Sequence, residues 1–143
     1  MTPIPVVPMA RHRAIAWPIP ERAALAARLA ALGLTITEAS DARELAGRPR
    51  LSESTPEQRH YSPLWFLGST GREYLAEART LRVLYTEALA QHHPDTVYTA
   101  RRLLGLRRST PSALRLCELS ALVAQCRVVE IVAEEREPTR LAA

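Results

Sequence analysis

The sequence predicts a mainly α-helical protein: a compact helical domain with a helix-turn-helix-like N-terminal part and a short C-terminal β edge. The 143 residues are 47% hydrophobic, which suits a single domain with a core of its own. Ala, Leu and Arg, all good helix formers, dominate several segments, and their apolar residues recur three to four positions apart. Pro, Gly and capping residues separate these segments, as they do between helices.

The chain divides into three parts by composition. Residues 1–19 are rich in proline, which predicts a flexible, extended arm that Trp17 anchors at its end. Residues 20–132 form the helical domain. Residues 133–143 are charged and are expected to be a frayed tail.

The first helix is expected over Glu21–Leu32, because Pro20 suits a helix start and Gly33 a helix end. A shorter helix follows over Asp41–Ala46, capped by Thr37 or Ser40 and ended by Gly47 and Pro49. The apolar stripe of the first helix comprises Ala24, Leu25, Leu29 and Leu32.

The short helix and Leu51-Ser52-Glu53 together resemble a helix-turn-helix unit. The alternative is a helical hairpin that packs on the core without reading DNA. Residues 48–63 are polar and interrupted by proline, so we expect a loop there.

A long helix should begin at a capping box, Thr70 to Glu73, and run to about Gln91. His92, His93 and Pro94 end it, and adjacent histidines at a helix end are more typical of a solvated terminus than of a metal site. The apolar stripe of this helix comprises Leu75, Ala78, Leu81, Tyr85 and Leu89.

Asp95 is expected to cap a further helix, Thr96–Leu104, that Gly105 closes. Its inward residues should be Val97, Ala100, Leu103 and Leu104. The pair Thr110-Pro111 starts the last helix, which runs to Val123 with Leu116, Leu119, Leu122 and Val123 on its core face. Cys126–Val132 is rich in β-branched residues and predicts a short strand.

No catalytic constellation emerges from the sequence. The chain contains no lysine, so a Walker-type phosphate loop is excluded, and neither a His-Glu-x-x-His nor a Gly-x-Ser-x-Gly motif occurs. Cys117 and Cys126 allow a disulfide or two metal ligands, but they are better interpreted as small core residues. The carboxylates Glu130, Glu134, Glu135 and Glu137 allow a divalent-ion site or, more simply, a solvated tail. We therefore expect a protein that is not an enzyme and has no metal or cofactor.

All 19 basic residues are arginine, and the net charge is +4. Either a GC-rich genome or a need for planar, bidentate donors explains that choice. One group of arginines brackets the turn before the last helix: Arg101, Arg102, Arg107, Arg108 and Arg115. Phosphates of duplex DNA are the favoured partner of these side chains. The acidic tail, an acidic face of a partner protein and a plain solvated surface are the alternatives.

No apolar run is long enough for a membrane span, and the prolines near Met1 argue against a signal helix. These features predict a cytoplasmic protein without a membrane partner.

The densest aromatic patch is Tyr61-Ser62-Pro63-Leu64-Trp65-Phe66. Trp65 and Phe66 lie between a proline-rich loop and a capped helix, where large apolar groups anchor a loop, so we expect both to be structural. If they are instead exposed, the patch is a binding surface.

Across residues 21–132 the chain resembles FlhC-like transcriptional regulators, the flagellar master-regulator subunits and their relatives in conjugative elements. Two segments carry the resemblance. The first is the aromatic signature of Tyr61, Ser62, Trp65 and Phe66, and the second is the segment with Asp95, Val97, Ala100, Arg102 and Leu103. The end of the first helix at Leu32-Gly33, the helix Ser112–Val123 and the edge Val128-Val129-Glu130-Ile131 also resemble the family. The stretch Pro111–Val123 is in addition similar to part of the partner subunit, FlhD.

The resemblance implies a DNA-binding transcriptional activator that works with an FlhD-like protein, as a hetero-oligomer or homodimer. Tyr61, Trp65, Phe66 and Asp95 would then support the fold or the contact with the partner. The four-cysteine zinc module of the family has no counterpart here, and the third helix of the helix-turn-helix region, Leu51–Gln58, is polar and broken by proline. The alternative function is therefore an interaction protein without DNA affinity, which occupies a partner and acts as an anti-activator.

Overall fold

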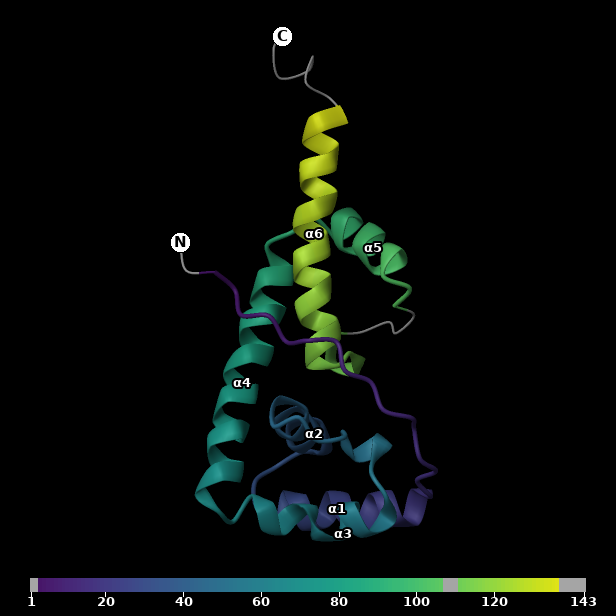
Figure 1. Ribbon diagram of the computed structural model, residues 1–143, viewed down its shortest axis with the longest axis vertical. Coiled ribbons are helices and arrows are strands. Elements are labelled where there is room, and N and C mark those ends of the chain that lie inside the picture. The colour runs from purple at the N-terminus through teal and green to yellow at the C-terminus, as the bar shows by residue number, and fades with distance from the viewer. Residues whose placement is uncertain (1–2, 107–110, 137–143) are drawn as a thin grey trace. The chain divides into compact units, whose positions relative to one another are not determined.

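The computed structural model describes residues 3–106 and 111–136 of the chain and is mainly helical, as expected (Figure 1). Within these residues there are six α-helices, two short 3-10 helices and no strand. In chain order they are α1 (Ile19–Ala30), α2 (Ile36–Leu45), η1 (Leu51–Glu53), α3 (Pro56–Trp65), α4 (Ser69–Ala90), α5 (Pro94–Leu103), η2 (Pro111–Ala113) and α6 (Leu116–Arg136).

The chain forms two compact units, whereas the sequence predicts one helical domain. Unit 2 comprises residues 10–81, and the described part of unit 1 comprises residues 3–9, 82–106 and 111–136. The helix α4 runs through both units, so its residues 69–81 belong to unit 2 and its residues 82–90 to unit 1. The apolar stripe predicted for this helix is confirmed, because all of its residues are buried.

Unit 2 packs α1 against α2 and α3. Leu25 and Leu29 of the predicted α1 stripe are buried, whereas Ala24 and Leu32 are exposed, so the buried stripe is narrower than expected. Gly71 allows α4 to begin close to the end of α3, because a Cβ at Gly71 would lie 2.2 Å from the carbonyl oxygen of Trp65.

Arginine side chains hold the connection between α2 and α3. Arg50 pairs with Asp41 at 2.7 Å and with Glu44 at 2.8 Å. Arg59 donates to the carbonyl oxygen of Leu51 at 2.8 Å, and also to those of Ile15 and Ala16 at 2.7 and 2.9 Å. These bonds satisfy carbonyl groups that irregular backbone would otherwise leave unpaired.

The structure corrects two sequence predictions in unit 2. Thr35, rather than Thr37 or Ser40, caps α2 through a capping box with Glu38, so this helix begins five residues earlier than expected. The segment predicted as a loop over 48–63 contains η1 and most of α3, because Thr55 and Gln58 form a second capping box and Pro56 occupies the first helical position.

The helix-turn-helix-like arrangement expected in this unit is not confirmed. Residues 46–55 separate α2 from α3, and this connection contains η1. It is longer than the turn of three or four residues that joins the two helices of a helix-turn-helix unit.

Unit 1 packs α5 along α6 beside the end of α4 (Figure 1). The predicted core face of the last helix is confirmed, since Leu116, Leu119, Leu122 and Val123 are all buried. The extended segment 3–9 also belongs to this unit: Val7 is buried and donates its N–H to Ser120 Oγ at 3.1 Å, and Tyr85 Oη donates to the carbonyl oxygen of Pro5 at 2.6 Å.

The C-terminal β edge predicted over Cys126–Val132 is wrong, because these residues lie within α6. No Gly or Pro interrupts the chain between Leu116 and Arg136, and the weak preference of valine and isoleucine for strands does not stop a helix that is already packed on one side. The frayed tail expected from 133 onward is likewise helical as far as Arg136, and residues 137–143 lie outside the described part.

The helix α5 also begins earlier than expected. His93, not Asp95, is its N-cap residue, and its Nδ1 accepts the backbone N–H of Asp95 at 3.1 Å. Ala100 is buried as predicted, whereas Leu103 is 65% exposed, which contradicts its expected inward position.

Candidate functional site

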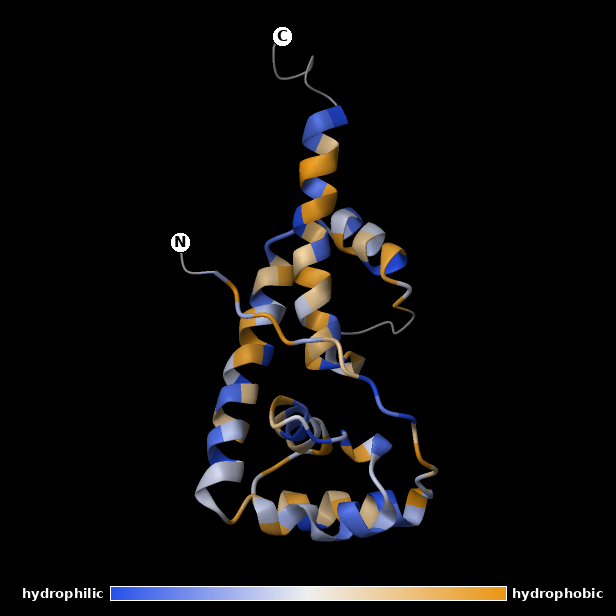
Figure 2. Ribbon diagram, viewed as in Figure 1, coloured by the Kyte–Doolittle hydropathy of each residue, from blue (hydrophilic) through white to orange (hydrophobic). Residues whose placement is uncertain are grey.

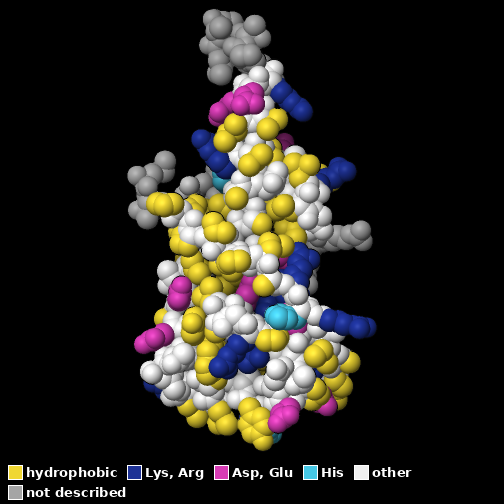
Figure 3. Space-filling view, viewed as in Figure 1, with side chains coloured by type: hydrophobic (Ala, Val, Ile, Leu, Met, Phe, Trp, Pro, Cys, Tyr) yellow, Lys and Arg dark blue, Asp and Glu magenta, His cyan; other side chains and the backbone are white. Residues whose placement is uncertain are grey.

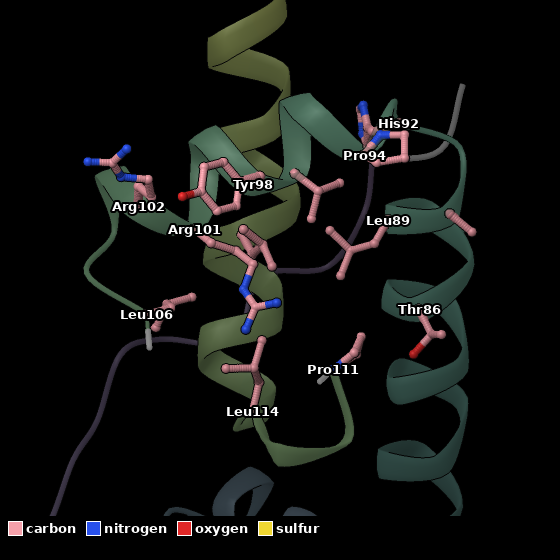
Figure 4. Close-up of a pocket in the computed structure, with 13 residues that line it drawn as sticks. Thr86, Leu89, His92, Pro94, Tyr98, Arg101, Arg102, Leu106, Pro111 and Leu114 are labelled. Carbon is pink, nitrogen blue, oxygen red and sulfur yellow. The ribbon is translucent and has the colours of Figure 1, made fainter. Parts of the chain in front are cut away.

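A groove of about 670 Å³ lies in unit 1 between the end of α4, α5 and the beginning of α6 (Figure 4). Its walls are mostly apolar, with Leu89 on α4, Val97 on α5 and Leu122 on α6. The polar side chains that line it are Thr86, His92, Tyr98, Arg101 and Arg102. In volume and lining the groove matches the usual binding site for a small molecule or an apolar side chain of a partner.

One side of the groove is fixed by hydrogen bonds to η2 and to the residue that follows it. Arg82 of α4 donates to the carbonyl oxygens of Pro111 at 3.2 Å and Leu114 at 2.8 Å. The backbone N–H of Arg115 donates to Glu118 Oε1 at 2.8 Å, which satisfies a donor at the start of α6. The beginning of α6 is therefore held in place by the Arg82 guanidinium of α4 and by the Glu118 carboxylate of α6 itself.

His92 and Glu130 form a contact between the end of α4 and the middle of α6. The hydrogen bond from His92 is the largest cause of the lowered pKa of the Glu130 carboxyl, and Arg127 lowers this pKa further. Burial acts in the opposite direction, but its effect on the pKa is smaller. His92 thus acts as a partner of Glu130, while His93 caps α5 and lies beside Asp95 at 3.7 Å.

The predicted arginine cluster is only partly assembled in the described residues. Arg101 and Arg102 lie together in the last turn of α5, and Figure 4 shows Arg101 extending into the groove and Arg102 pointing away from it. Arg102 is exposed and lies over the ring of Tyr98, 5.9 Å from its centroid. Arg115 is half-buried and pairs with Glu118 at 4.0 Å. Arg107 and Arg108 lie outside the described residues.

The aromatic signature lies in unit 2, at the end of α3. Phe66 is buried, as expected. Trp65 is only half-buried, with Tyr74 stacked on its ring at 5.9 Å and the Arg48 guanidinium 4.7 Å from its centroid. Tyr61 is 56% exposed, so it does not pack in the core with Phe66. Asp95 is exposed in the first turn of α5.

Cys117 and Cys126 are free thiols buried in α6. Burial raises the pKa of the Cys126 thiol, and the nearby Glu130 carboxylate raises it further. Among residues 3–106 and 111–136, no group of three or more His, Cys, Asp or Glu side chains is arranged to hold a metal ion.

The second half of α6 carries an apolar face that the strand expected over Cys126–Val132 does not predict. Val128, Ile131 and Val132 are 48, 40 and 39% exposed, respectively. Figure 2 shows hydrophobic residues on successive turns of this part of α6, and Figure 3 shows hydrophobic side chains at its surface. The unbroken helix-compatible sequence from 116 to 136 could have revealed this face, had the β-branched run not been assigned to a strand.

No protein-family model, no curated protein and no solved structure matches the chain. In the part of the chain that the structure describes, every helix is too short or too polar to span a lipid bilayer.

Proposed function

We propose that the protein is a non-enzymatic regulator of transcription that resembles FlhC and acts by binding an FlhD-like protein through unit 1. The observation that carries this proposal is the distribution of apolar side chains on α6. Its first half buries Leu116, Leu119 and Leu122, whereas its second half exposes the α6 apolar face of Val128, Ile131 and Val132.

A helix with apolar residues on all sides is normally covered on all sides. In α6 the residues at the start of the helix, Leu116 to Ser120, are buried on every side, whereas the apolar face of the second half is open to solvent. Exposed Leu103 and Tyr98 on α5 add apolar surface to the same unit. Larger apolar surfaces of this kind mark contacts between proteins.

The sequence resemblance supports the identity of the partner, because the segment Asp95–Leu103, which carries part of it, forms most of α5 in this same unit. The acidic residues Glu134 and Glu135 at the end of α6 and Arg127 near its middle frame the apolar face with charges of opposite sign. Such charges at the rim of an interface set its register and orientation.

Binding of an FlhD-like protein by the full chain tests the proposal. The double variant Val128→Glu/Ile131→Glu should weaken binding by at least about tenfold, because each substitution places a charge in an apolar contact. Val83→Glu is the matched control, since Val83 is 56% exposed on α4. Sedimentation analysis of mixtures gives the affinities. If wild-type protein does not bind, or if the double variant binds as tightly as the control, the proposal is wrong.

DNA binding is a second candidate function, favoured by the adjacent Arg101 and Arg102 at the end of α5. Arginine side chains commonly contact the phosphates of a duplex. In this case α5 would contact DNA in the complex with the partner, and affinity would decrease steeply with salt.

A fluorescence titration of duplex DNA at several salt concentrations, with the partner present, tests the second candidate. Replacing Arg101 and Arg102 with Ala should reduce the slope of log affinity against log salt by about two if both contact phosphates. Arg28→Ala, which removes an exposed arginine from α1, is the control and should leave the slope unchanged. Equal slopes for the double variant and the control would exclude α5 as the DNA contact. If the wild-type protein does not bind duplex DNA even at low salt with the partner present, the anti-activator function takes its place.

A further inference from the structure

A second pocket, of about 320 Å³, lies within unit 2 and involves none of the residues assigned to partner or DNA binding in unit 1. It lies where α2, the connection to η1 and α3 meet, and Arg43, Arg48 and Ser62 line it. Gln58, Tyr61, Trp65 and Pro49 complete the lining. Three residues of the aromatic signature thus surround this pocket, whereas the fourth, Phe66, packs in the core.

The pocket contains two positive charges and no carboxylate. Arg43 is buried, and its guanidinium donates only to uncharged acceptors among the described residues: Pro49 O at 2.7 Å and Ser54 Oγ at 3.3 Å. The neighbouring carboxylates of Asp41 and Glu44 bind Arg50. Burial lowers the pKa of the Arg43 guanidinium, and repulsion from Arg48 lowers it further. A buried cation beside a like charge is costly unless an anion neutralises it.

Ser62 supplies a second and independent observation. It is 2% exposed, and its Oγ is the one buried side-chain oxygen or nitrogen without a hydrogen-bond partner in the part of the chain that the structure describes. A buried hydroxyl normally has a partner, and one that lines a pocket is available to a bound ligand. The helix α3 holds this hydroxyl on the same wall as Tyr61 and Trp65.

We propose that this pocket binds the phosphate group of a small phosphorylated molecule, held by the guanidinium groups of Arg43 and Arg48 and by the hydroxyl of Ser62. Guanidinium groups are well suited to phosphate because their planar donors match its oxygens. The pocket volume exceeds what a phosphate alone fills, and the Trp65 and Tyr61 rings offer apolar contacts to the organic part. The bound phosphate neutralises Arg43 and gives Ser62 Oγ its missing partner.

Thermal unfolding of the full chain with inorganic phosphate tests the proposal, with chloride at equal ionic strength as the reference. Phosphate should raise the melting temperature by about 5 °C at ten times its dissociation constant, because it binds only the folded state. Absence of any rise beyond that in chloride would overturn the proposal.

Two variants assign the effect to this pocket. Arg48→Gln removes an exposed donor and should weaken phosphate binding about tenfold. Ser62→Ala removes a hydroxyl that has no partner, so it should leave the melting temperature without phosphate unchanged or higher, yet weaken phosphate binding several-fold. A merely structural serine would show the opposite: lower stability and an unchanged phosphate response.

Arg22→Gln is the matched control, because Arg22 is an exposed arginine of the same unit that also lies over a tryptophan ring, that of Trp17. It should respond to phosphate like the wild type. If Arg48→Gln and Ser62→Ala respond in full, the phosphate binds elsewhere and the proposal is wrong. If Arg48→Gln weakens duplex DNA binding while free phosphate has no effect on wild-type protein, the pocket holds backbone phosphates instead, and the small-molecule proposal is overturned.

Discussion

The two units of the chain are stabilised by different interactions. In unit 2 the buried side chains include Asp41, Arg43, Glu53 and Arg59, and they hold the connection between α2 and α3 in place. In the described part of unit 1 the core is apolar apart from Glu118 and Ser120 near the start of α6. The second half of α6 also exposes apolar side chains, those of Val128, Ile131 and Val132, to solvent.

The two units also use arginine differently, as an internal hydrogen-bond donor in unit 2 and as a side chain at a groove and a surface in unit 1. The amino-acid composition alone cannot distinguish these two uses. Arg50 and Arg59 are internal donors to carboxylates and carbonyl groups, a task for which a planar guanidinium is suited. Arg101 and Arg102 lie at the end of a helix in unit 1, one extending into a groove and the other exposed. An arginine-rich sequence therefore does not by itself indicate nucleic-acid binding.

The largest expected effect is in the charged network of unit 2. Arg50→Met leaves the carboxylates of Asp41 and Glu44 without this cation in a mostly buried setting, and it should reduce the free energy of unfolding by about 3–5 kcal/mol. Urea denaturation measures the loss, with Arg28→Met on the exposed face of α1 as the control. A loss below about 1 kcal/mol would show that the network is solvated.

In unit 1 the counterpart of Arg50→Met is a substitution of an apolar core side chain. Leu119 is fully buried in α6, so Leu119→Ala should reduce the free energy of unfolding by about 2–5 kcal/mol. Leu103→Ala is the matched control, since Leu103 is mostly exposed on α5. Similar melting temperatures for the two variants would contradict the assigned packing of α6.

A smaller effect is expected where segment 3–9 joins unit 1. Tyr85→Phe keeps the buried ring and removes the hydrogen bond to Pro5 O, which should reduce the free energy of unfolding by about 1 kcal/mol. Deletion of residues 3–6 from both the wild type and the Tyr85→Phe variant is the accompanying test. Once Pro5 is absent, urea denaturation should find a smaller difference in stability between the two chains, and an undiminished difference would show that the hydrogen bond to Pro5 O does not stabilise the fold.

The smallest effect concerns pH. The hydrogen bond from His92 lowers the pKa of Glu130 below its ordinary value of 4.5, so the carboxylate stabilises the folded state above that value and loses its contribution as the pH falls through the lowered pKa. Wild-type protein should melt slightly above Glu130→Gln at about pH 7, and the two should converge in the acid range. A difference that persists at acid pH would mean that Glu130 acts through packing rather than charge.

The sequence predicted the helices with a clear apolar periodicity and missed α3, whose signal is a capping box. The stripe from Leu75 to Leu89 is strongly periodic, and all of it is buried. Pro56 and Pro63 favour turns and therefore predict a loop where α3 lies. Thr55 and Gln58 nevertheless carry the signal of a capping box, which marks the start of a helix. The strand expected near Cys126 is wrong because local strand preference is weak, and residues 3–106 and 111–136 contain no other strand with which it could pair.

The candidate sites were less predictable than the helices. Arg101 and Arg102 were identified from their place in the sequence, but the pairing of Arg115 with Glu118 depends on the start of α6. The pocket around Ser62 brings together residues from α2 and α3 whose contact depends on the Arg50 and Arg59 bonds. No local pattern of residues encodes such a contact.

Hydrogen–deuterium exchange of the full chain, with and without an FlhD-like protein, tests the central claim that unit 1 binds the partner through α6. We expect slower exchange in α6 around Val128–Val132 on binding and unchanged exchange in α3. Slower exchange confined to unit 2, with α6 unaffected in a complex that does form, would contradict the claim.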